Sequence, residues 1–169
     1  LERLAPVPGD PGAVVQAIPK NSPAPQAASM TDPEPMWVAG TVKGLDGPLS
    51  LEGQWSVVVF WASWCLPCRV ELPEADAMAK RLEEAGVQVI AVSMDERRED
   101  ALKYLSSAGL ENMQQAWDLD FGRAIDVNAL PTMIVVDPRG IVVQTLQGYV
   151  GEELLRIEHE LLEERGTGE

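Results

Sequence analysis

The sequence has few cysteine and histidine residues, and its basic side chains are outnumbered by acidic ones. It contains two cysteines, Cys65 and Cys68, and one histidine, His159. One close cysteine pair cannot form a structural disulfide framework, and no second pair is available to complete a four-ligand zinc site. Thirteen Lys and Arg residues stand against 27 Asp and Glu residues, which gives a net charge of −14. Because nucleic acids and anionic membrane surfaces are recognised through Lys/Arg clusters, this charge argues against both as partners.

Long hydrophobic runs are also missing. No apolar run approaches the ~20 residues needed to cross a bilayer, so we expect no transmembrane segment in this sequence. A length of 169 residues suits one domain, and 46% apolar with 24% charged residues is typical of a globular protein. The chain begins with Leu1 rather than Met, and we therefore expect that an N-terminal signal or membrane anchor is not included in it.

Prolines are concentrated near the start of the chain. Residues 5–35 contain eight of the thirteen prolines, interleaved with Ala, Gly, Ser and Gln. This composition predicts that residues 1–35 are a flexible Pro/Ala-rich linker, part of a membrane-tether region, which holds a folded domain at 36–169. The alternative is an arm that folds back onto the domain through its few aliphatic side chains.

Both cysteines lie where an apolar strand is followed by a helix. Residues 57–61 form an unbroken β-branched and aromatic run, typical of a strand buried on both faces. From the second cysteine onward, residues spaced by three and four share one helix face: Cys68, Glu71, Ala75, Met78, Leu82 and Ala85. Glu71 is the one charged residue on that face, and burying a carboxylate is costly unless the group has a function. The alternative is that Glu71 turns outward where Pro73 kinks the helix.

The predicted position of Cys65 makes it a nucleophile. Free backbone N–H groups and the positive end of the helix dipole stabilise a thiolate, so the pKa of Cys65 should lie below its ordinary value. Cys68, three residues later, can close a disulfide with it and should be the more buried, resolving thiol. Leu66 and Pro67 lie between the two sulfurs and should tune the reduction potential. The alternative is a buried cysteine pair without redox function. It would not explain why the pair lies at a helix N-terminus or why a proline stands between the two cysteines.

Two longer stretches of sequence are more specific than the cysteine pair alone. They are FWASWCLPCRVELP at Phe60 to Pro73 and ALPTMIVVDPRG at Ala129 to Gly140. Together they resemble the thioredoxin-like thiol–disulfide oxidoreductases, and within them the membrane-tethered, extracytoplasmic TlpA/ResA-like group linked to cytochrome c maturation and oxidase assembly. The resemblance implies an α/β thioredoxin-like fold, with a central mixed β-sheet flanked by helices and an added N-terminal β-hairpin.

The resemblance also implies roles for single residues. Thioredoxin-like proteins have a cis-proline that faces the active disulfide, and Leu130-Pro131-Thr132 stands at that position. The ResA-like group carries a glutamate three residues after the second cysteine, thought to relay protons to the buried thiol, and Glu71 stands there. Cytosolic thioredoxins have a buried aspartate six residues before the first cysteine. Here that residue is Val59, so we expect Glu71 to take over the proton transfer.

These observations define one candidate site for dithiol chemistry. The expected catalytic residues are Cys65, Cys68, Glu71 and Pro131. The expected substrate-binding residues are Trp64, Leu66, Pro67, Leu130 and Thr132. We expect no metal and no organic cofactor. The expected partners are protein substrates with disulfides, such as apocytochrome c or copper-site assembly proteins, and an upstream membrane thiol reductant. The resemblance implies a periplasmic, extracytoplasmic location, tethered to the cytoplasmic membrane.

Three other functions stay open from the sequence. A disulfide oxidase or isomerase would use the same fold in the opposite redox direction. A copper- or zinc-binding module would use both thiolates as soft ligands, but neither His159 nor the methionines have a spacing that predicts the required third ligand. A peroxidase of the related thioredoxin-fold type would place its cysteine in a Thr-x-x-Cys context, whereas the third residue before Cys65 is Ala62.

Hydrophobic periodicity and turn residues predict the other elements. They are a hairpin of 37–42 with 48–51, strands at 56–62, 87–93, 132–137 and 141–147, an edge strand at 114–119, helices ending at Ala85 and spanning 97–108 and 152–164, and a helical turn at 121–126. The order strand, helix, strand over residues 56–93 predicts two parallel strands joined by a right-handed crossover.

Overall fold

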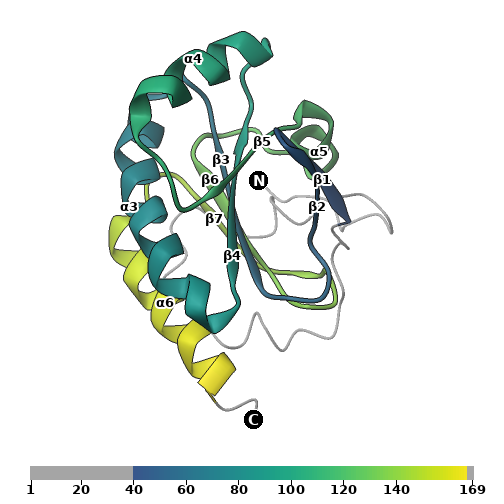
Figure 1. Ribbon diagram of the computed structural model, residues 1–169, viewed down its shortest axis with the longest axis vertical. Helices are drawn as coiled ribbons and strands as arrows, with labels where there is room; N and C mark the ends of the chain where they lie inside the picture. The colour runs from purple at the N-terminus through teal and green to yellow at the C-terminus, as the bar shows by residue number, and fades with distance from the viewer. Residues whose placement is uncertain (1–39, 167–169) are drawn as a thin grey trace, which may run out of the picture.

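The part of the chain that the structure describes, residues 40–166, alternates short strands with helices in this computed structural model (Figure 1). The strands are β1 (Thr41–Gly44), β2 (Gly47–Ser50), β3 (Ser56–Trp61), β4 (Gln88–Ser93), β5 (Gln114–Trp117), β6 (Thr132–Val136) and β7 (Val142–Gln147). The helices are α3 (Leu66–Leu82), α4 (Arg98–Ala108), α5 (Leu119–Ala124) and α6 (Gly151–Gly166), with a 3-10 turn η1 (Glu83–Ala85) after α3. The predicted linker 1–35 and the start of the predicted hairpin, 37–39, lie outside the described residues.

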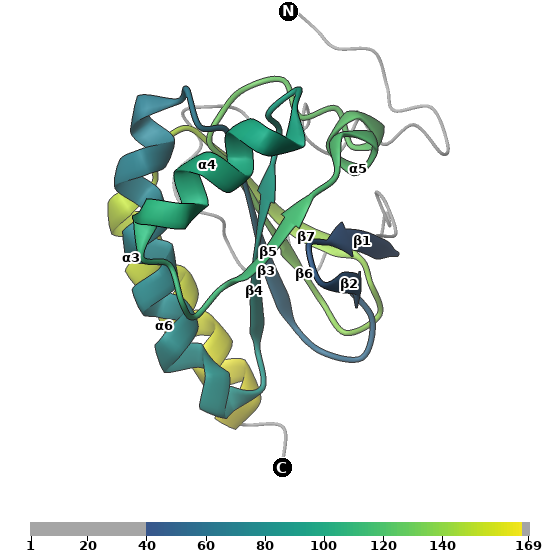
Figure 2. The same ribbon diagram turned by 45° about the horizontal axis from the view of Figure 1, so that its top comes forward.

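The strands form one mixed sheet in the order β2-β1-β5-β4-β3-β6-β7. Helices α3, α4 and α6 cover one face and α5 lies on the other, while the β1–β2 hairpin forms one end of the sheet (Figures 1 and 2). The predicted central mixed sheet with flanking helices and an added N-terminal hairpin is therefore confirmed. Among residues 40–166, no helix is long and apolar enough to span a bilayer.

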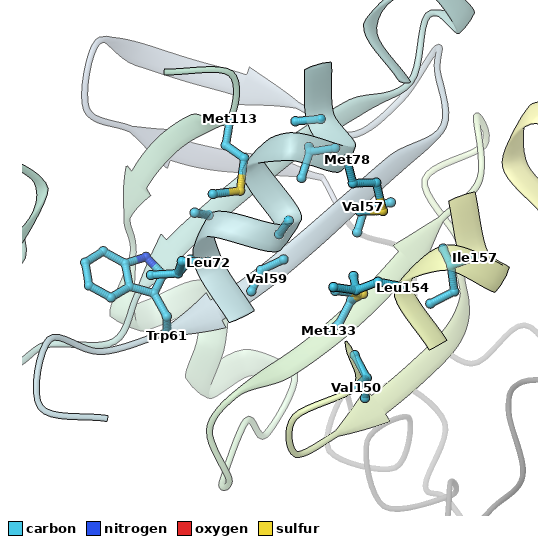
Figure 3. Close-up of a cluster of buried hydrophobic side chains, with 14 of the residues drawn as sticks. Val57, Val59, Trp61, Leu72, Met78, Met113, Met133, Val150, Leu154 and Ile157 are labelled. Atoms are coloured by element: carbon cyan, nitrogen blue, oxygen red, sulfur yellow. The ribbon is translucent and has the colours of Figure 1, made fainter. Parts of the chain in front are cut away.

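Strand β3 supplies side chains to the hydrophobic core on both faces of the sheet. Val57, Val59 and Trp61 belong to the cluster under α3 and α6, which Figure 3 shows. Val58 and Phe60 belong to the cluster on the side of α5. All residues of β3 are buried, as the unbroken apolar run predicts.

The segment from β3 through α3 to β4 places the first turn of α3 at one edge of the sheet. β3 and β4 are parallel, from the pair Ser56 and Gln88 to the pair Trp61 and Ser93, which confirms the predicted parallel strands. Gly86, with φ of 77°, adopts the left-handed conformation that ends this helical region, as predicted. Since parallel strands end at the same edge, residues that follow β3 and β4 meet there.

The expectation of an edge strand at 114–119 is wrong. β5 lies inside the sheet, between β4 and β1. Its outer neighbour is the N-terminal hairpin, because Gly44 pairs with Ala116 and the Leu45 N–H donates to the Gln115 carbonyl at 2.9 Å. The hairpin itself is confirmed. The Asp118 carboxylate stabilises it by accepting a hydrogen bond from the Lys43 N–H at 2.9 Å.

The other expected bounds differ from the observed ones by a few residues. The helix expected to end at Ala85 ends as α3 at Leu82 and continues as the 3-10 turn η1. The β6–β7 hairpin is confirmed, and in its turn the Gly140 N–H donates to the Asp137 carbonyl at 2.8 Å. On α6, the predicted inward residues Leu154, Ile157 and Leu161 are all buried.

Candidate active site

The two cysteines form a disulfide at the N-terminus of α3. Their Cα atoms are 5.3 Å apart. Cys65 is the N-cap of the helix, and its sulfur accepts a hydrogen bond from the Cys68 N–H at 3.3 Å. Cys65 is 5% exposed and Cys68 is 0% exposed, so the first cysteine is the more accessible, as predicted. The Cys68 N–H, at the N-terminus of the helix, thus points at the sulfur that would carry a negative charge after reduction.

The local sequence explains this position. β3 ends at Trp61, the Cys65 N–H donates to the Ala62 carbonyl at 3.1 Å, and the helix begins at Leu66. Pro67 stands in the first helical turn, where its missing N–H would have no partner within the helix. The sequence therefore turns the chain from strand to helix within four residues and leaves Cys65 at the corner.

Glu71 is buried one turn beyond Cys68. Its side chain has no exposed surface, so the alternative in which it turns outward near Pro73 is wrong. Its Oε2 accepts the Val150 N–H at 3.0 Å, whereas its Oε1 has no hydrogen-bond partner among the described residues. Burial raises the pKa of Glu71 from 4.5 to about 7, against the lowering effect of the Val150 hydrogen bond. Glu71 can therefore gain or lose a proton near neutral pH.

Pro131 lies at the same edge of the sheet as the disulfide. The Leu130–Pro131 peptide bond is cis, as predicted. Thr132 pairs with Phe60 in the sheet, which places Pro131 beside the end of β3. Leu130 is half-buried, whereas Thr132 is fully buried and its hydroxyl donates to the Ala129 carbonyl. The Thr132 hydroxyl therefore stabilises the loop that contains Pro131.

Exposed apolar side chains surround the disulfide. Trp64 is 68% exposed and Leu66 is 70% exposed, and Pro67 between the cysteines is exposed as well. Val70, which the sequence analysis did not select, is also exposed, one helical turn beyond Leu66. Trp61 differs from Trp64 because it is fully buried and packs against Tyr104 at 5.2 Å between ring centroids. The exposed group can contact an apolar segment of another chain.

Sequence reasoning missed two charged residues beside the cysteines. The Asp95 carboxylate is buried and accepts hydrogen bonds from Ser63, and the Arg69 guanidinium donates to the Ser63 carbonyl. A signal for Asp95 was present, because it follows the apolar run 87–93, which was predicted to lie parallel to the active-site strand. Nothing in the sequence indicated that Arg69 contacts the Ser63 carbonyl, because this hydrogen bond depends on the path of the loop between β3 and α3.

A second missed group connects α3 with the start of α6. The Tyr149 hydroxyl donates to Glu74 at 2.8 Å, and this hydrogen bond raises the pKa of Tyr149. The neighbouring Gly148 N–H donates to the Pro131 carbonyl at 2.8 Å. Together with the hydrogen bond from Val150 to Glu71, these contacts hold residues 148–150 against both α3 and the Pro131 loop. No local pattern in the sequence indicates them.

Potential metal ligands are scattered in the described part of the chain. Among residues 40–166, no group of three His, Cys, Asp or Glu side chains has the geometry to hold a metal ion. His159 is exposed on α6, where its Nδ1 lies 3.0 Å from a Glu163 oxygen.

Sequence comparisons place this arrangement among known proteins. The family profile described as the AhpC/TSA family matches residues 46–145. The thiol-disulfide oxidoreductase ResA of Bacillus subtilis (strain 168) is 31% identical over 107 residues, which cover 62% of this chain and 59% of that protein. The thiol:disulfide interchange protein DsbE of Xylella fastidiosa (strain Temecula1) is 38% identical over 106 residues, covering 60% of this chain and 50% of that protein.

A comparison with solved structures also finds a thiol:disulfide interchange protein. The crystal structure of a putative thiol:disulfide interchange protein DsbE from Chlorobium tepidum has a TM-score of 0.67 and 30% sequence identity. The match covers 75% of this chain and 92% of that one. By contrast, this chain spans between half and about three fifths of the length of the two curated relatives above.

Proposed function

The chain belongs to the AhpC/TSA family, whose profile covers more than half of it, and from this premise we propose that it is a thiol–disulfide oxidoreductase that reduces protein disulfides. The single observation that carries the proposal is the Cys65–Cys68 disulfide at the N-terminus of α3, with Cys65 as the N-cap. Relatives named ResA and DsbE support it, since they are named as a thiol-disulfide oxidoreductase and a thiol:disulfide interchange protein.

The proposed reaction is a pair of thiol–disulfide exchanges. The Cys65 thiolate attacks one sulfur of a substrate disulfide, which breaks the substrate S–S bond and forms a mixed disulfide with Cys65. The other substrate sulfur leaves as a thiolate in this first step. The Cys68 thiolate then attacks the Cys65 sulfur, closes the Cys65–Cys68 disulfide and releases the substrate sulfur that was bound to Cys65, which takes up a proton as a thiol. Two electrons pass from the protein dithiol to the substrate. The dithiol must then be restored by an external dithiol reductant, for which we propose an upstream membrane thiol reductant.

In this reaction Glu71 is the proton acceptor for Cys68. Cys68 must lose its proton to attack, and it is fully buried away from water. Glu71 lies one helical turn later on the same face, has a pKa of about 7, and has one oxygen without a partner in the described residues. A general base is most effective when its pKa lies near the working pH, and Glu71 meets this condition.

The substrate is proposed to be a protein segment with an apolar side chain close to its disulfide. Trp64, Leu66 and Pro67 are exposed around the disulfide and would contact that segment. Leu130 and Pro131, at the same edge of the sheet, would contact the substrate backbone. The family resemblance supports apocytochrome c or copper-site assembly proteins as substrates, and an extracytoplasmic location with a tether through residues 1–35.

An equilibrium redox titration at several pH values, followed by the fluorescence of Trp61 and Trp64, tests the proposal. A midpoint at or below about −200 mV supports a dedicated reductase, whereas a midpoint near about −120 mV marks an oxidant and favours an oxidase or isomerase. Absence of any reversible two-electron transition would contradict both directions of exchange. In that case a metal-binding module that uses both thiolates is the next function to test, by metal uptake in the parent protein and in Cys65→Ser.

A further inference from the structure

The short loop between β3 and α3, residues 62–64, is held in place from two sides, and we propose that Asp95 is the positioning residue for this loop and therefore for Cys65. The inference rests on the proposed function, because it concerns the same pair of thiols. The loop has no regular secondary structure, and Cys65 follows it directly. Whatever fixes the loop also fixes how close the Cys65 sulfur stays to Cys68.

Asp95 is a buried carboxylate whose hydrogen-bond donors are two serines. It is 1% exposed. The Ser63 N–H lies 3.1 Å from its Oδ1 and 3.0 Å from its Oδ2, and the Ser63 hydroxyl donates to Oδ1 at 2.7 Å. The Ser93 hydroxyl donates to Oδ2 at 2.8 Å. A carboxylate this deeply buried is strongly destabilising without donors, so Ser63 and Asp95 keep each other in position.

The backbone around Asp95 is itself rigidly attached to the sheet. The strands β3 and β4 are parallel, and Trp61 at the end of one pairs with Ser93 at the end of the other. The Met94 N–H donates to the Trp61 carbonyl at 2.7 Å. The Asp95 carbonyl accepts the indole N–H of Trp117 at 2.7 Å. Asp95 is therefore a fixed support on the edge of the sheet, from which its carboxylate reaches the loop.

Arg69 holds the loop through a different group, the Ser63 carbonyl. Its Nε donates to the Ser63 carbonyl at 2.8 Å, and its Nη2 donates to the same oxygen. Its guanidinium also lies over the ring of Tyr104, 5.3 Å from the centroid. The N–H, the hydroxyl and the carbonyl of Ser63 are thus all engaged. Because the carboxylate and the guanidinium act on one residue, Ser63 has little freedom to move.

This restraint should determine the equilibrium between the dithiol and the disulfide. Closing the disulfide is an intramolecular reaction, so its equilibrium constant rises with the effective concentration of one sulfur near the other. If Ser63 is released, Cys65 samples more positions and the disulfide forms less readily. The reduction potential then rises, since the reduced form gains freedom that the oxidised form does not have.

The test is the equilibrium with glutathione, in which the protein dithiol and one oxidised glutathione give the protein disulfide and two reduced glutathione molecules. Asp95→Asn, which keeps the shape but turns one acceptor into a donor, should lower the equilibrium constant about tenfold, equivalent to a potential about 30 mV higher. Ser63→Ala, which keeps the Asp95 charge, should lower it about threefold. Ser63→Thr, which keeps the hydroxyl, should have the same equilibrium constant as the parent protein.

Asp76→Asn is the matched control, because Asp76 is another buried carboxylate that accepts backbone N–H groups, but from residues 111–113. It should lower the free energy of unfolding in urea and leave the glutathione equilibrium unchanged. If Asp95→Asn does not fold, the two Ser63 variants decide the matter. An equilibrium constant within about twofold of the parent in every variant that folds would overturn the inference and leave Asp95 a structural carboxylate. Failure of the proposed function is a separate result, in which the parent protein itself shows no reversible transition.

Discussion

Helix α3 carries two buried carboxylates, Glu71 and Asp76, whose surroundings differ. Asp76 is 7% exposed and accepts four hydrogen bonds, from the backbone of residues 111–113 and from the Asn112 side chain. Glu71 is 0% exposed, accepts one hydrogen bond from Val150, and has one oxygen without a partner in the described residues. Both carboxylates are on the same helix, within two turns of each other.

The difference separates a structural carboxylate from one available for chemistry. Asp76 has donors on both oxygens, all from residues 111–113, so it attaches α3 to the loop before β5. Glu71 lacks such donors, and burial raises its pKa to about 7. The carboxylate that we propose as the proton acceptor is therefore the one with fewer hydrogen-bond donors, located three residues after Cys68. Four predictions test this contrast.

The largest expected effect is a loss of stability in Asp76→Ala. This change leaves the backbone N–H groups of residues 111–113 without their acceptor, and we expect the free energy of unfolding to fall by about 4 kcal/mol. Urea unfolding of the oxidised protein measures it. The redox midpoint should stay unchanged. A stable Asp76→Ala protein with an altered midpoint would reverse the roles assigned to the two carboxylates.

The next effect concerns the pH dependence of stability and comes from Glu71. Its folded-state pKa of about 7 is higher than its ordinary value of 4.5, so the folded protein holds a proton that the unfolded chain releases. The resulting stabilisation is complete below pH about 4.5 and is lost as the pH rises to about 7, a change of about 3 kcal/mol. The measurement is urea unfolding of the parent and Glu71→Gln across this range. The parent should lose about 3 kcal/mol relative to Glu71→Gln, and parallel curves would contradict the raised pKa.

A smaller effect is expected on the kinetics of Glu71→Gln. The glutamine keeps the size and can still accept the Val150 N–H, but it cannot take the proton from Cys68. The resolving step should therefore slow by about tenfold or more at neutral pH, with its pH dependence shifted. Stopped-flow decay of a Cys65 mixed disulfide measures this step. Glu84→Gln is the control, since Glu84 is an exposed carboxylate beyond the end of α3. Equal rates in all three proteins would make Glu71 a structural residue.

The sequence predicted the parts of the fold that depend on short-range patterns. Apolar runs located β3 and β4, and glycines marked the ends of α3 with its 3-10 turn and of α4, because each signal lies within a few neighbouring residues. The position of β5 could not be predicted in the same way. Whether a strand lies at an edge depends on which other strand pairs with it, and the hairpin that covers β5 is some seventy residues earlier in the chain.

The same limit applies to the candidate site. Cys65, Cys68, Glu71 and Pro131 stand in two local motifs, so they could be selected from the sequence as candidate site residues. Asp76 was missed because it follows Ala75 of the core-facing stripe and its partners come from a separate loop. The burial of Glu71 was expected from its place on the core-facing stripe, whereas the Val150 hydrogen bond, which lowers its pKa, depends on tertiary structure.

The smallest expected effect lies at the far end of α3, where Arg81 contacts Glu158 of α6. The Arg81 Nε and Nη2 donate to the two Glu158 oxygens at 2.6 and 2.8 Å, the paired geometry that favours an Arg–carboxylate contact. Because Arg81 is 49% exposed and water screens the pair, Arg81→Ala should lower the free energy of unfolding by about 1 kcal/mol. Arg97→Ala, which removes an exposed pair with Asp100, should cause no measurable change. If Arg81→Ala moved the redox midpoint as well, a contact far from the cysteines would also affect the dithiol, and the midpoint could no longer separate the role of Glu71 from that of Asp76.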